Sequence, residues 1–171
     1  VIGINPAQIR KDLSYFGEFG RQGLGYNIEK LKEGIKKIIG LSETQNIILV
    51  GVGNLGKAIL NYNVITQRGF SIIAAFDSDP DLIGKIINNV GVFDIKKVES
   101  VIRDKKVKCA ILTLPPDQVM KTIEKLSSLD IKGFLNFAPI NLNLSKDIRI
   151  VNVDLSSSLE VLMYYLSLIH I

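Results

Sequence analysis

Three glycines, Gly51, Gly53 and Gly56, occur in the segment GVGNLG with the spacing G-x-G-x-x-G. The apolar run NIILV precedes them and KAIL follows, so they lie in a turn between a strand and a helix. Gly51 allows a sharp turn, Gly53 lets the backbone approach a pyrophosphate, and Gly56 allows close helix packing. Such a turn can bind a dinucleotide at the helix N-terminus. The alternative is a glycine-rich turn without a ligand.

An acidic residue at the end of the next strand supports a dinucleotide ligand. Asp77 closes the run SIIAAFD and lies 21 residues after Gly56. A carboxylate there binds the adenosine ribose and repels a 2′-phosphate, which favours NAD(H) over NADP(H). Asp79 and Asp81 are close enough to compete for this role, although both are also typical of the turn that follows a strand.

Two later loops are expected to face the same ligand, because ligands of open parallel sheets lie beyond the carboxyl ends of the strands. These loops are TLPP at residues 113–116 and NFAP at residues 136–139. In one alternative reading they are only strand ends stiffened by proline. The expected cofactor contacts are Gly51, Val52, Gly53, Asn54, Leu55, Gly56, Asp77, Thr113, Leu114, Pro115, Asn136 and Phe137. Among these, the Asn136 amide is suited to a carboxamide, and Pro115 and Phe137 are expected to line the nicotinamide ring.

Groups for acid–base or nucleophilic chemistry are scarce. His170 is the only histidine and lies at the extreme C-terminus, and Cys109 in the run CAILTL is expected to be a buried thiol. Lys57 follows the glycine turn and is expected to be solvated. No Cys, His, Asp and Glu cluster has metal-site spacing, and there is no nucleophile elbow. The sequence therefore favours a protein that binds NAD(H) without metal or catalysis.

The elements around these residues predict an α/β fold. From Asn46 onward, strand-like runs alternate with helix-like runs, which predicts a Rossmann-type parallel sheet with helices on both faces. An irregular stretch is expected after SIIAAFD, followed by a charged helix at residues 98–105. The expected strands are NIILVG, SIIAAFD, CAILTL, GFLNFA and IRIVNV, and the final helix is SSLEVLMYYL.

A different pattern precedes this region. Asn5, Pro6 and Gln8 form an N-cap, a first-turn proline and a capping-box partner, so a helix is expected to begin there. The glycine-rich segment EFGRQGLGYN predicts a tight hairpin or wing. A connector helix is expected at residues 28–39, with Gly40 as its terminator.

The 171-residue chain is 47% hydrophobic and 22% charged, a balance typical of globular proteins. No apolar run reaches the roughly 18 residues that a membrane span needs. Residues 1–40 carry seven Lys and Arg against four Asp and Glu, out of 21 and 17 in the chain, so the basic excess is mostly N-terminal. A single cysteine excludes a disulfide framework and is consistent with the cytoplasm.

Both ends of the chain are expected to differ from a native protein's ends. Val1 is not an initiator methionine and leads directly into a helix start, so we expect further residues upstream. At the other end, LSLIHI loses the pattern of the final helix and matches one reading frame of a transposon adapter used in sequencing libraries. We therefore expect residues 167–171 to be a non-native tail.

The order of these segments resembles the Rex family of redox-sensing transcriptional repressors. The similarity runs from about residue 3 to residue 166 and is carried by long blocks, which makes it far more specific than the glycine spacing. These blocks are NPAQIRKDLSYFGEFGRQGLGYN, GVGNLGKAILNY, AAFDSDPDLIG, AILTLPPDQ, IKGFLNFAP and VDLSSSLEVLMYYL.

The resemblance implies a division into five parts. Residues 1–26 would be the recognition helix and wing of an incomplete winged-helix domain, and residues 27–44 the connector. Residues 45–154 would bind NAD(H), and residues 155–166 would form a dimerisation helix that crosses to the other subunit. Such a protein is a cytoplasmic homodimer and not an enzyme. It represses transcription from operator DNA when NADH is scarce and releases the DNA when NADH binds.

The resemblance also implies roles for particular residues. Arg10, Lys11, Ser14 and Tyr15 can supply phosphate and base-edge contacts from a helix in the major groove. Arg21 and Gln22 would contact the backbone or the minor groove from the wing tip. The alternative is an amphipathic helix with solvated charges.

Asp154 would couple the cofactor site to the subunit contact, although a cap on the final helix is the simpler interpretation. Two other functions compete with a redox-sensing repressor. One is a small NAD-dependent oxidoreductase or its cofactor-binding fragment. The other is a CoA-binding domain.

Overall fold

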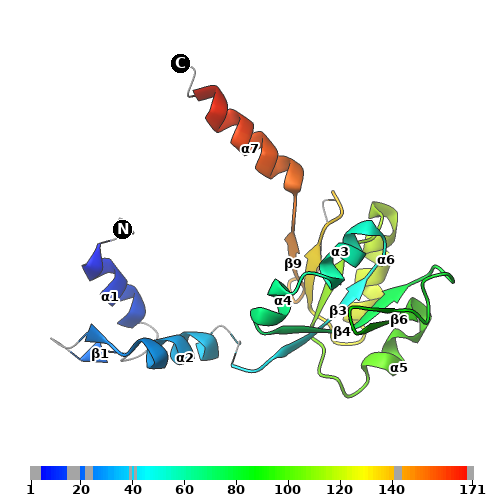
Figure 1. The fold of residues 1–171 in the computed structure, drawn as a ribbon, viewed down its shortest axis with the longest axis horizontal. Helices are drawn as coiled ribbons and strands as arrows, with labels where there is room; N and C mark the ends of the chain where they lie inside the picture. Colours follow the sequence, from blue (N-terminus) through cyan, green and yellow to red (C-terminus); the bar gives the residue numbers. More distant parts are fainter. Residues whose placement is uncertain are drawn as a thin grey trace. The chain divides into compact units, whose positions relative to one another are not determined.

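The computed structural model describes residues 5–14, 20–21, 25–38, 40, 42–140 and 144–168. The chain divides into two units, residues 1–45 and residues 46–171, which Figure 1 draws in one view. This division lies one residue from the boundary expected between residues 44 and 45.

The first unit begins with helix α1 (Pro6–Ser14). Its N-cap is confirmed, because the Asn5 Oδ1 atom accepts a hydrogen bond of 2.9 Å from the backbone N–H of Ala7. The expected capping box is wrong. Gln8 donates its side-chain amide to Asp12 Oδ1 at 2.7 Å, so its side chain extends along the helix instead of returning to Asn5.

A hairpin and a second helix complete the first unit. Strands β1 (Gly20–Arg21) and β2 (Gly25–Tyr26) pair antiparallel, which confirms the expected hairpin. Helix α2 (Ile28–Ile38) follows, and its first turn is capped where Asn27 Oδ1 accepts from the N–H of Lys30 at 3.0 Å. Gly40 has φ +74°, the left-handed conformation that ends helices.

The second unit contains a seven-stranded sheet among its described residues, with the order β5-β6-β4-β3-β7-β8-β9. The pairs β3·β7, β4·β6, β7·β8 and β8·β9 are parallel, which confirms a mostly parallel α/β sheet. Its strands are β3 (Gln45–Val50), β4 (Phe70–Asp77), β5 (Ile86–Ile87), β6 (Val90–Asp94), β7 (Cys109–Leu112), β8 (Gly133–Asn136) and β9 (Arg149–Asn152).

The stretch expected to be irregular contains two of these strands, so that expectation was wrong. Strands β5 and β6 pair antiparallel and are joined by Asn88 and Asn89, both with positive φ (47° and 64°). Two left-handed residues make a tight hairpin turn, and asparagine tolerates this conformation without glycine. Strand β5 is too short to show an alternating pattern in the sequence.

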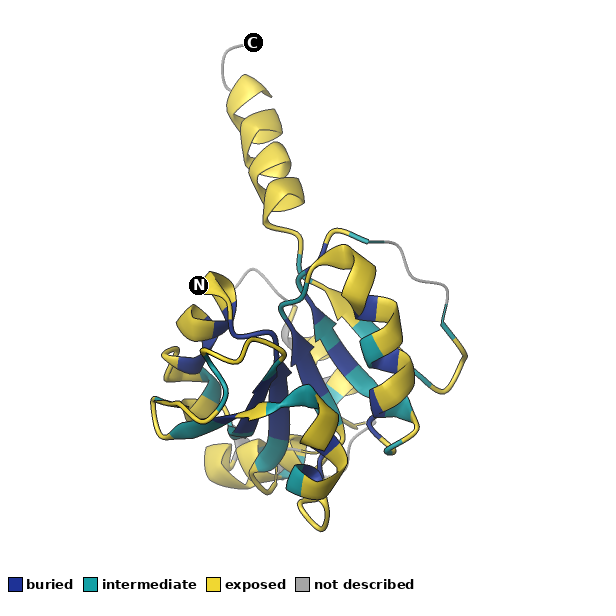
Figure 2. Cartoon of the chain, turned by 90° about the vertical axis from the view of Figure 1, so that its right-hand side faces the viewer, coloured by how far each residue is buried: buried dark blue, intermediate teal, exposed yellow. Residues whose placement is uncertain are grey.

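Helices cover both faces of the sheet, as expected. Alternate residues of a strand point to opposite faces, so Ile48 and Val50 join one apolar cluster while Ile47 and Leu49 join the other. Figure 2 shows the buried strands between these layers. The first cluster packs on α5 (Val98–Ile102) and α6 (Pro116–Ser127), and the second on α3 (Asn54–Leu60) with α4 (Val64–Gln67) close by.

Helix α5 is shorter than the expected 98–105. The short 3-10 helix η1 (Ile95–Lys97) leads into it, and Arg103 leaves the helical conformation with ψ 133°. Asp104 and Lys106 then have positive φ (64° and 51°), which a helix does not accommodate. Helix α4 was not anticipated at all, because its four residues lack a helical repeat.

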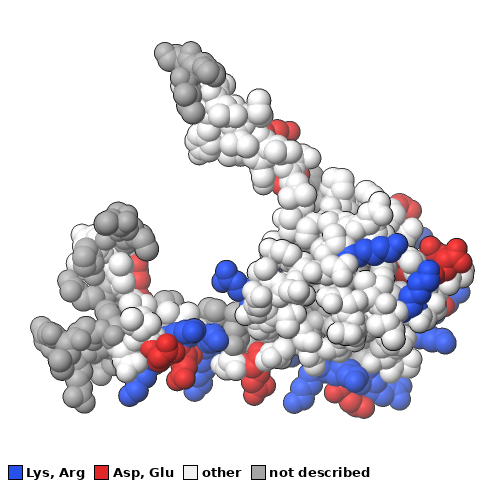
Figure 3. Space-filling model, in the orientation of Figure 1, with Lys and Arg blue, Asp and Glu red and all other residues white. Residues whose placement is uncertain are grey.

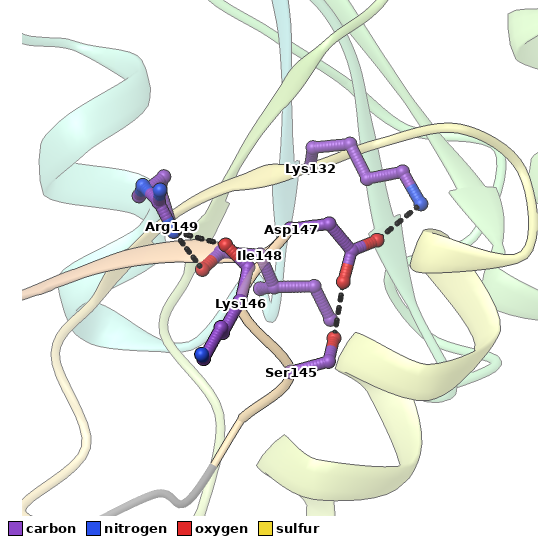
Figure 4. Close-up of polar contacts among 6 residues, drawn as sticks. All are labelled: Lys132, Ser145, Lys146, Asp147, Ile148 and Arg149. Carbon is purple, nitrogen blue, oxygen red and sulfur yellow. Dashed lines mark hydrogen bonds and ion pairs between the residues drawn. The ribbon is translucent and has the colours of Figure 1, made fainter.

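The loop that enters strand β9 is held by polar contacts (Figure 4). Asp147 forms an ion pair with Lys132 at 3.1 Å and accepts a hydrogen bond from Ser145 Oγ at 2.5 Å. The Ser145 hydroxyl, followed by Lys132, lowers the pKa of Asp147. The Arg149 guanidinium donates to the carbonyl of Lys146. The ion pair ties the loop to Lys132, the residue before β8. Strand β9, which follows the loop, pairs with β8.

Helix α7 (Leu155–Leu168) ends the described chain, and every one of its residues is exposed. Its helix continues through Ser167 and Leu168, the first two residues of the segment expected to be a non-native tail. Figure 3 shows the helix almost entirely in white, because its sequence LSSSLEVLMYYLSL holds one charged residue, Glu160. An apolar helix without a covering partner is unusual in a folded protein.

Candidate functional site

The glycine turn has the geometry that its spacing predicts. Gly51 has φ +94°, and a Cβ atom added there would lie 2.4 Å from the carbonyl oxygen of Thr113. A Cβ on Gly56 would lie 2.1 Å from the carbonyl oxygen of Gly51. A Cβ on Gly53 would meet nothing within 4 Å. Gly51 and Gly56 therefore serve close packing, whereas Gly53 borders open space into which a ligand can come close.

A cavity of about 580 Å³ opens beside this turn. It is large enough for a small-molecule ligand and lies beyond the carboxyl ends of β3, β4 and β7. Eight of the expected cofactor residues line it, namely Gly51, Gly53, Asn54, Leu55, Asp77, Thr113, Leu114 and Pro115. Two more, Val52 and Gly56, are buried beneath the turn.

Asp79, which the sequence offered as a competitor of Asp77, also lines the cavity. Six further lining residues were missed by sequence reasoning: Val50, Ser78, Leu82, Ile95, Gln118 and Thr122. Gln118 and Thr122 lie four residues apart on α6, which begins in the TLPP loop. Residues at this spacing share one helix face, and this is the signal by which the sequence could have identified them. Ile95 follows β6, which the sequence did not reveal as a strand, so its position at the carboxyl edge had no signal.

Thr113 locks the two loops of the cavity together. Its hydroxyl donates to the carbonyl of Gly51 at 2.6 Å, and its backbone N–H donates to the carbonyl of Val50 at 2.9 Å. The TLPP loop is thereby fixed against the glycine turn before any ligand binds. A preorganised site loses less conformational entropy on binding.

Asp77 is bound to the backbone on both of its oxygens. Oδ2 accepts from the N–H of Val52 at 2.6 Å, a hydrogen bond that joins the end of β4 to the glycine turn. Oδ1 accepts from the N–H groups of Ser78 at 2.7 Å and Asp79 at 2.9 Å. The carboxylate lines the cavity as expected, and it also ties the glycine turn to the neighbouring strand.

Asn136 and Phe137 do not line the cavity. Asn136 is fully buried, and its amide donates to the carbonyl of Ala138 and to Asn152 Oδ1, both at 2.9 Å. Its oxygen accepts from the N–H of Ala138 at 3.1 Å. In this conformation the amide is occupied within the protein and cannot meet a nicotinamide carboxamide, in contrast to our expectation. Asn136 instead shapes the NFAP loop, and Phe137 packs half-buried against the cluster that contains Val52.

The charges around the cavity are acidic. Asp77 and Asp79 are among its lining residues, and none of the described lining residues is Lys or Arg. A phosphate on the adenosine ribose needs positive partners in a protein site. The lining therefore suits a ribose with free hydroxyls better than the 2′-phosphate of NADPH or the 3′-phosphate of CoA.

Asp154 is the N-cap of helix α7. Its Oδ1 atom accepts from the N–H groups of Ser156 at 2.9 Å and Ser157 at 3.2 Å, and Oδ2 accepts from the Ser157 hydroxyl at 2.6 Å. The Ser157 hydroxyl is the main cause that lowers the pKa of Asp154. The structure therefore confirms that Asp154 caps α7, which was the simpler interpretation of this residue.

The residues expected to contact DNA are described only in part. Lys11 and Ser14 are exposed on α1, and the Ser14 hydroxyl donates to the carbonyl of Lys11 at 2.7 Å. Arg10 lies on α1 and Arg21 on β1, whereas Tyr15 and Gln22 fall outside the described residues.

Within the described ranges, no group of three His, Cys, Asp or Glu could hold a metal ion. His170 lies outside them. Cys109 is half-buried, and burial raises the pKa of its thiol, so this side chain is a poor nucleophile. None of the helices that the structure describes is long and apolar enough to cross a membrane.

Comparison with known proteins gives concordant matches. The family model "CoA binding domain" matches residues 42–140. The redox-sensing transcriptional repressor Rex of Desulfitobacterium hafniense is 43% identical over 163 residues, which cover 95% of this chain and 78% of that protein. A structure of RSP in complex with β-NAD⁺ and operator DNA has a TM-score of 0.87 and 42% identity, covering 96% of this chain and 76% of RSP. The complex of RSP with β-NADH has a TM-score of 0.80 and 40% identity, with the same coverage.

Proposed function

Since the chain belongs to the Rex family of redox-sensing transcriptional repressors, we propose that it binds NAD(H) in the cavity beside the glycine turn and operator DNA through its N-terminal unit. It is a regulator of transcription and not an enzyme. The observation that carries the proposal is the cavity at Gly53, lined by carboxylates and free of cations among its described residues.

The cavity accommodates the parts of the cofactor in an order set by its walls. The pyrophosphate lies against Gly53, which has no Cβ atom, and against the backbone at the start of α3, which no side chain caps. The adenosine ribose lies beside the acidic residues that follow β4. The match to a CoA-binding family then reflects the shared fold, since no described cation of the cavity could neutralise a 3′-phosphate.

The nicotinamide ring lies beside Leu114 and Pro115, which line the cavity, whereas Phe137, which the sequence also suggested, does not line it. Leu114 and Pro115 offer apolar surface, and transfer of a cationic ring into such surroundings is unfavourable without a compensating carboxylate. NADH, whose ring is neutral, therefore binds more tightly than NAD⁺. The preference for the reduced form is what allows a binding protein to report the redox state without oxidising its ligand.

DNA binding resides in α1 and the β1–β2 hairpin, the recognition helix and wing of a winged-helix domain. Arg10, Lys11, Ser14 and Tyr15 contact phosphates and base edges in the major groove. Arg21 and Gln22 contact the backbone or the minor groove. Operator DNA is bound when NADH is scarce and released when NADH binds. Because bacterial DNA lies in the cytoplasm, the protein acts there.

Helix α7 supports a homodimer. Leu155, Leu159, Leu162 and Leu166 recur at helical spacing, and all four are exposed by 45% or more. Exposed apolar surface of this kind marks a protein interface. A second copy of the chain offers the same stripe, so two copies bury it together, with α7 crossing to the other subunit.

Asp154 couples the cofactor site to this interface through the start of α7. Asp154→Ala removes two carboxylate oxygens that accept three hydrogen bonds at the helix start, whereas Asp154→Asn keeps an N-cap without the charge. In a protein that includes the residues expected upstream of Val1, we expect Asp154→Ala to blunt NADH-driven DNA release while NADH affinity changes by only a few-fold. NADH titrations of DNA binding by fluorescence anisotropy measure both quantities.

The asparagine variant separates capping from charge. If capping carries the coupling, Asp154→Asn restores release. The pKa of Asp154 is lowered in the folded protein. The stability that the charged carboxylate contributes is therefore present above the ordinary pKa of aspartate, and it is lost as pH falls through the lower folded pKa. Normal release by Asp154→Ala would reject the coupling role.

A titration of the chain with four nucleotides tests the cofactor assignment. NADH is expected to bind most tightly, followed by NAD⁺, with NADPH and CoA much weaker. The matching assay for the rival oxidoreductase follows the absorbance of NADH during reduction of keto acids by NADH and oxidation of alcohols by NAD⁺. We expect no turnover in either direction. Tight CoA binding without NADH binding would overturn the proposal.

A further inference from the structure

The hydrogen bonds of Asp77 limit what else this carboxylate can bind. A carboxylate has about four acceptor positions, two on each oxygen. The N–H groups of Ser78 and Asp79 occupy both positions on Oδ1, and the N–H of Val52 occupies one on Oδ2. One position is left, on the oxygen that already holds the glycine turn. The two vicinal hydroxyls of a ribose need at least two acceptors, so Asp77 cannot bind both without releasing the backbone.

Asp79 is differently placed. It lines the same cavity, is exposed, and its Oδ1 atom accepts one hydrogen bond, from the N–H of Asp81 at 2.8 Å. Among the described contacts its Oδ2 atom has no partner, which leaves three acceptor positions. Its backbone is fixed, because its carbonyl accepts from the N–H groups of Leu82 at 3.1 Å and Ile83 at 3.2 Å. The carboxylate is therefore held at the cavity wall with both oxygens available.

The surroundings of Asp79 suit an adenosine. Leu82 follows it in the same turn, and Ile95 and Leu114 line the cavity as well, giving apolar surface for a purine ring. A carboxylate next to a purine site meets the ribose attached to that ring. Its negative charge repels a phosphate on the 2′ position.

We propose that Asp79 binds the ribose hydroxyls of NAD(H) and rejects NADPH, whereas Asp77 positions the glycine turn through Val52. This assignment rests on the proposed function, since it takes NAD(H) as the ligand of the cavity. It departs from the sequence motif, which gives the ribose to the residue that closes the second strand. The departure follows from the acceptor count at Asp77.

Two matched variants test the assignment. Asp79→Asn keeps the oxygen that accepts from Asp81, so the turn is retained, but it loses the charge and replaces one acceptor by a donor. We expect it to weaken NADH binding by about ten- to a hundredfold and to bring the NADH and NADPH affinities closer together. Thermal stability should remain close to that of the unchanged chain.

Asp77→Asn acts on the turn instead. In one orientation the amide nitrogen faces the N–H of Val52, and that hydrogen bond is lost. In the other orientation the nitrogen faces the N–H groups of Ser78 and Asp79, and those two hydrogen bonds are lost. We expect a lower melting temperature and weaker binding of NADH and NADPH by the same factor, with their ratio unchanged. Calorimetric titration of both variants with both nucleotides gives the two ratios.

The outcomes distinguish this assignment from the proposed function. A changed NADH to NADPH ratio in Asp77→Asn, with an unchanged ratio in Asp79→Asn, would overturn the assignment and leave NAD(H) binding intact. Unchanged NADH affinity in Asp79→Asn would also overturn it. If the unsubstituted chain bound neither nucleotide, the proposed function itself would fail.

Discussion

Gly53→Val is expected to abolish NADH binding while the protein stays folded. The backbone at Gly53 is extended, with φ −67° and ψ −163°, so it lies outside the left-handed region that favours glycine, and a Cβ there meets nothing within 4 Å. The added side chain therefore projects into the space that we assign to the pyrophosphate. We expect a loss of affinity of about a hundredfold or more, measured by titration with NADH. Gly53→Ala, with a single methyl group, should give a smaller loss.

Gly56→Ala is the matched control, because it alters the same turn on its packed side. Its Cβ would lie 2.1 Å from the carbonyl oxygen of Gly51, so the helix or the turn must shift. Such overpacking typically costs about 1–3 kcal/mol, and we expect a clear drop in melting temperature. Gly53→Val should leave the melting temperature nearly unchanged. A similar drop in both variants would contradict the view that Gly53 borders a binding site.

Charges placed on the leucine stripe of α7 are expected to dissociate the dimer. The double variant Leu159→Lys with Leu162→Lys puts two cations on a surface that we expect to be buried between subunits. Full burial of one leucine contributes about 1.5–3 kcal/mol, so two per chain correspond to more than a hundredfold in the dissociation constant. Sedimentation equilibrium should show a dimer for the unchanged chain and a monomer for the variant.

The control for this prediction is Glu160→Lys with Ser167→Lys, which adds the same type of residue on α7 outside the leucine stripe and away from the Asp154 cap. It should leave the dimer largely intact. A monomeric unchanged chain, or a double leucine variant that still sediments as a dimer, would refute the assigned interface.

Sequence reasoning was sufficient where a residue type is required by backbone geometry. Gly51 and Gly56 each have a separate steric reason in the structure, as the spacing predicted, whereas the open space at Gly53 agrees with the approach of a ligand that we propose there. The strand-like runs that alternate with helix-like runs likewise predicted a sheet with helices on both faces. Thr113 could be placed at the cavity as a strand-end residue, although its hydroxyl bond to Gly51 could not be foreseen.

Side-chain hydrogen bonds were the main limit of sequence reasoning. Asn136 looked suited to a carboxamide, but whether an amide is free depends on its neighbours, and Ala138 and Asn152 occupy it. Asp77 was placed correctly at the cavity, yet its three backbone partners lie in two separate loops. Short elements were the other limit, since β5 has only two residues.

The most direct test of the redox-sensor account is the release of bound DNA by the two forms of the cofactor. A protein that includes the residues expected upstream of Val1 is first used to select binding sites from a random pool of double-stranded DNA, at fixed salt. The selected complex is then titrated with NADH and with NAD⁺ while fluorescence anisotropy reports bound DNA. The account predicts release at a much lower concentration of NADH than of NAD⁺. Equal release by both forms, or DNA binding unaffected by NADH, would contradict it.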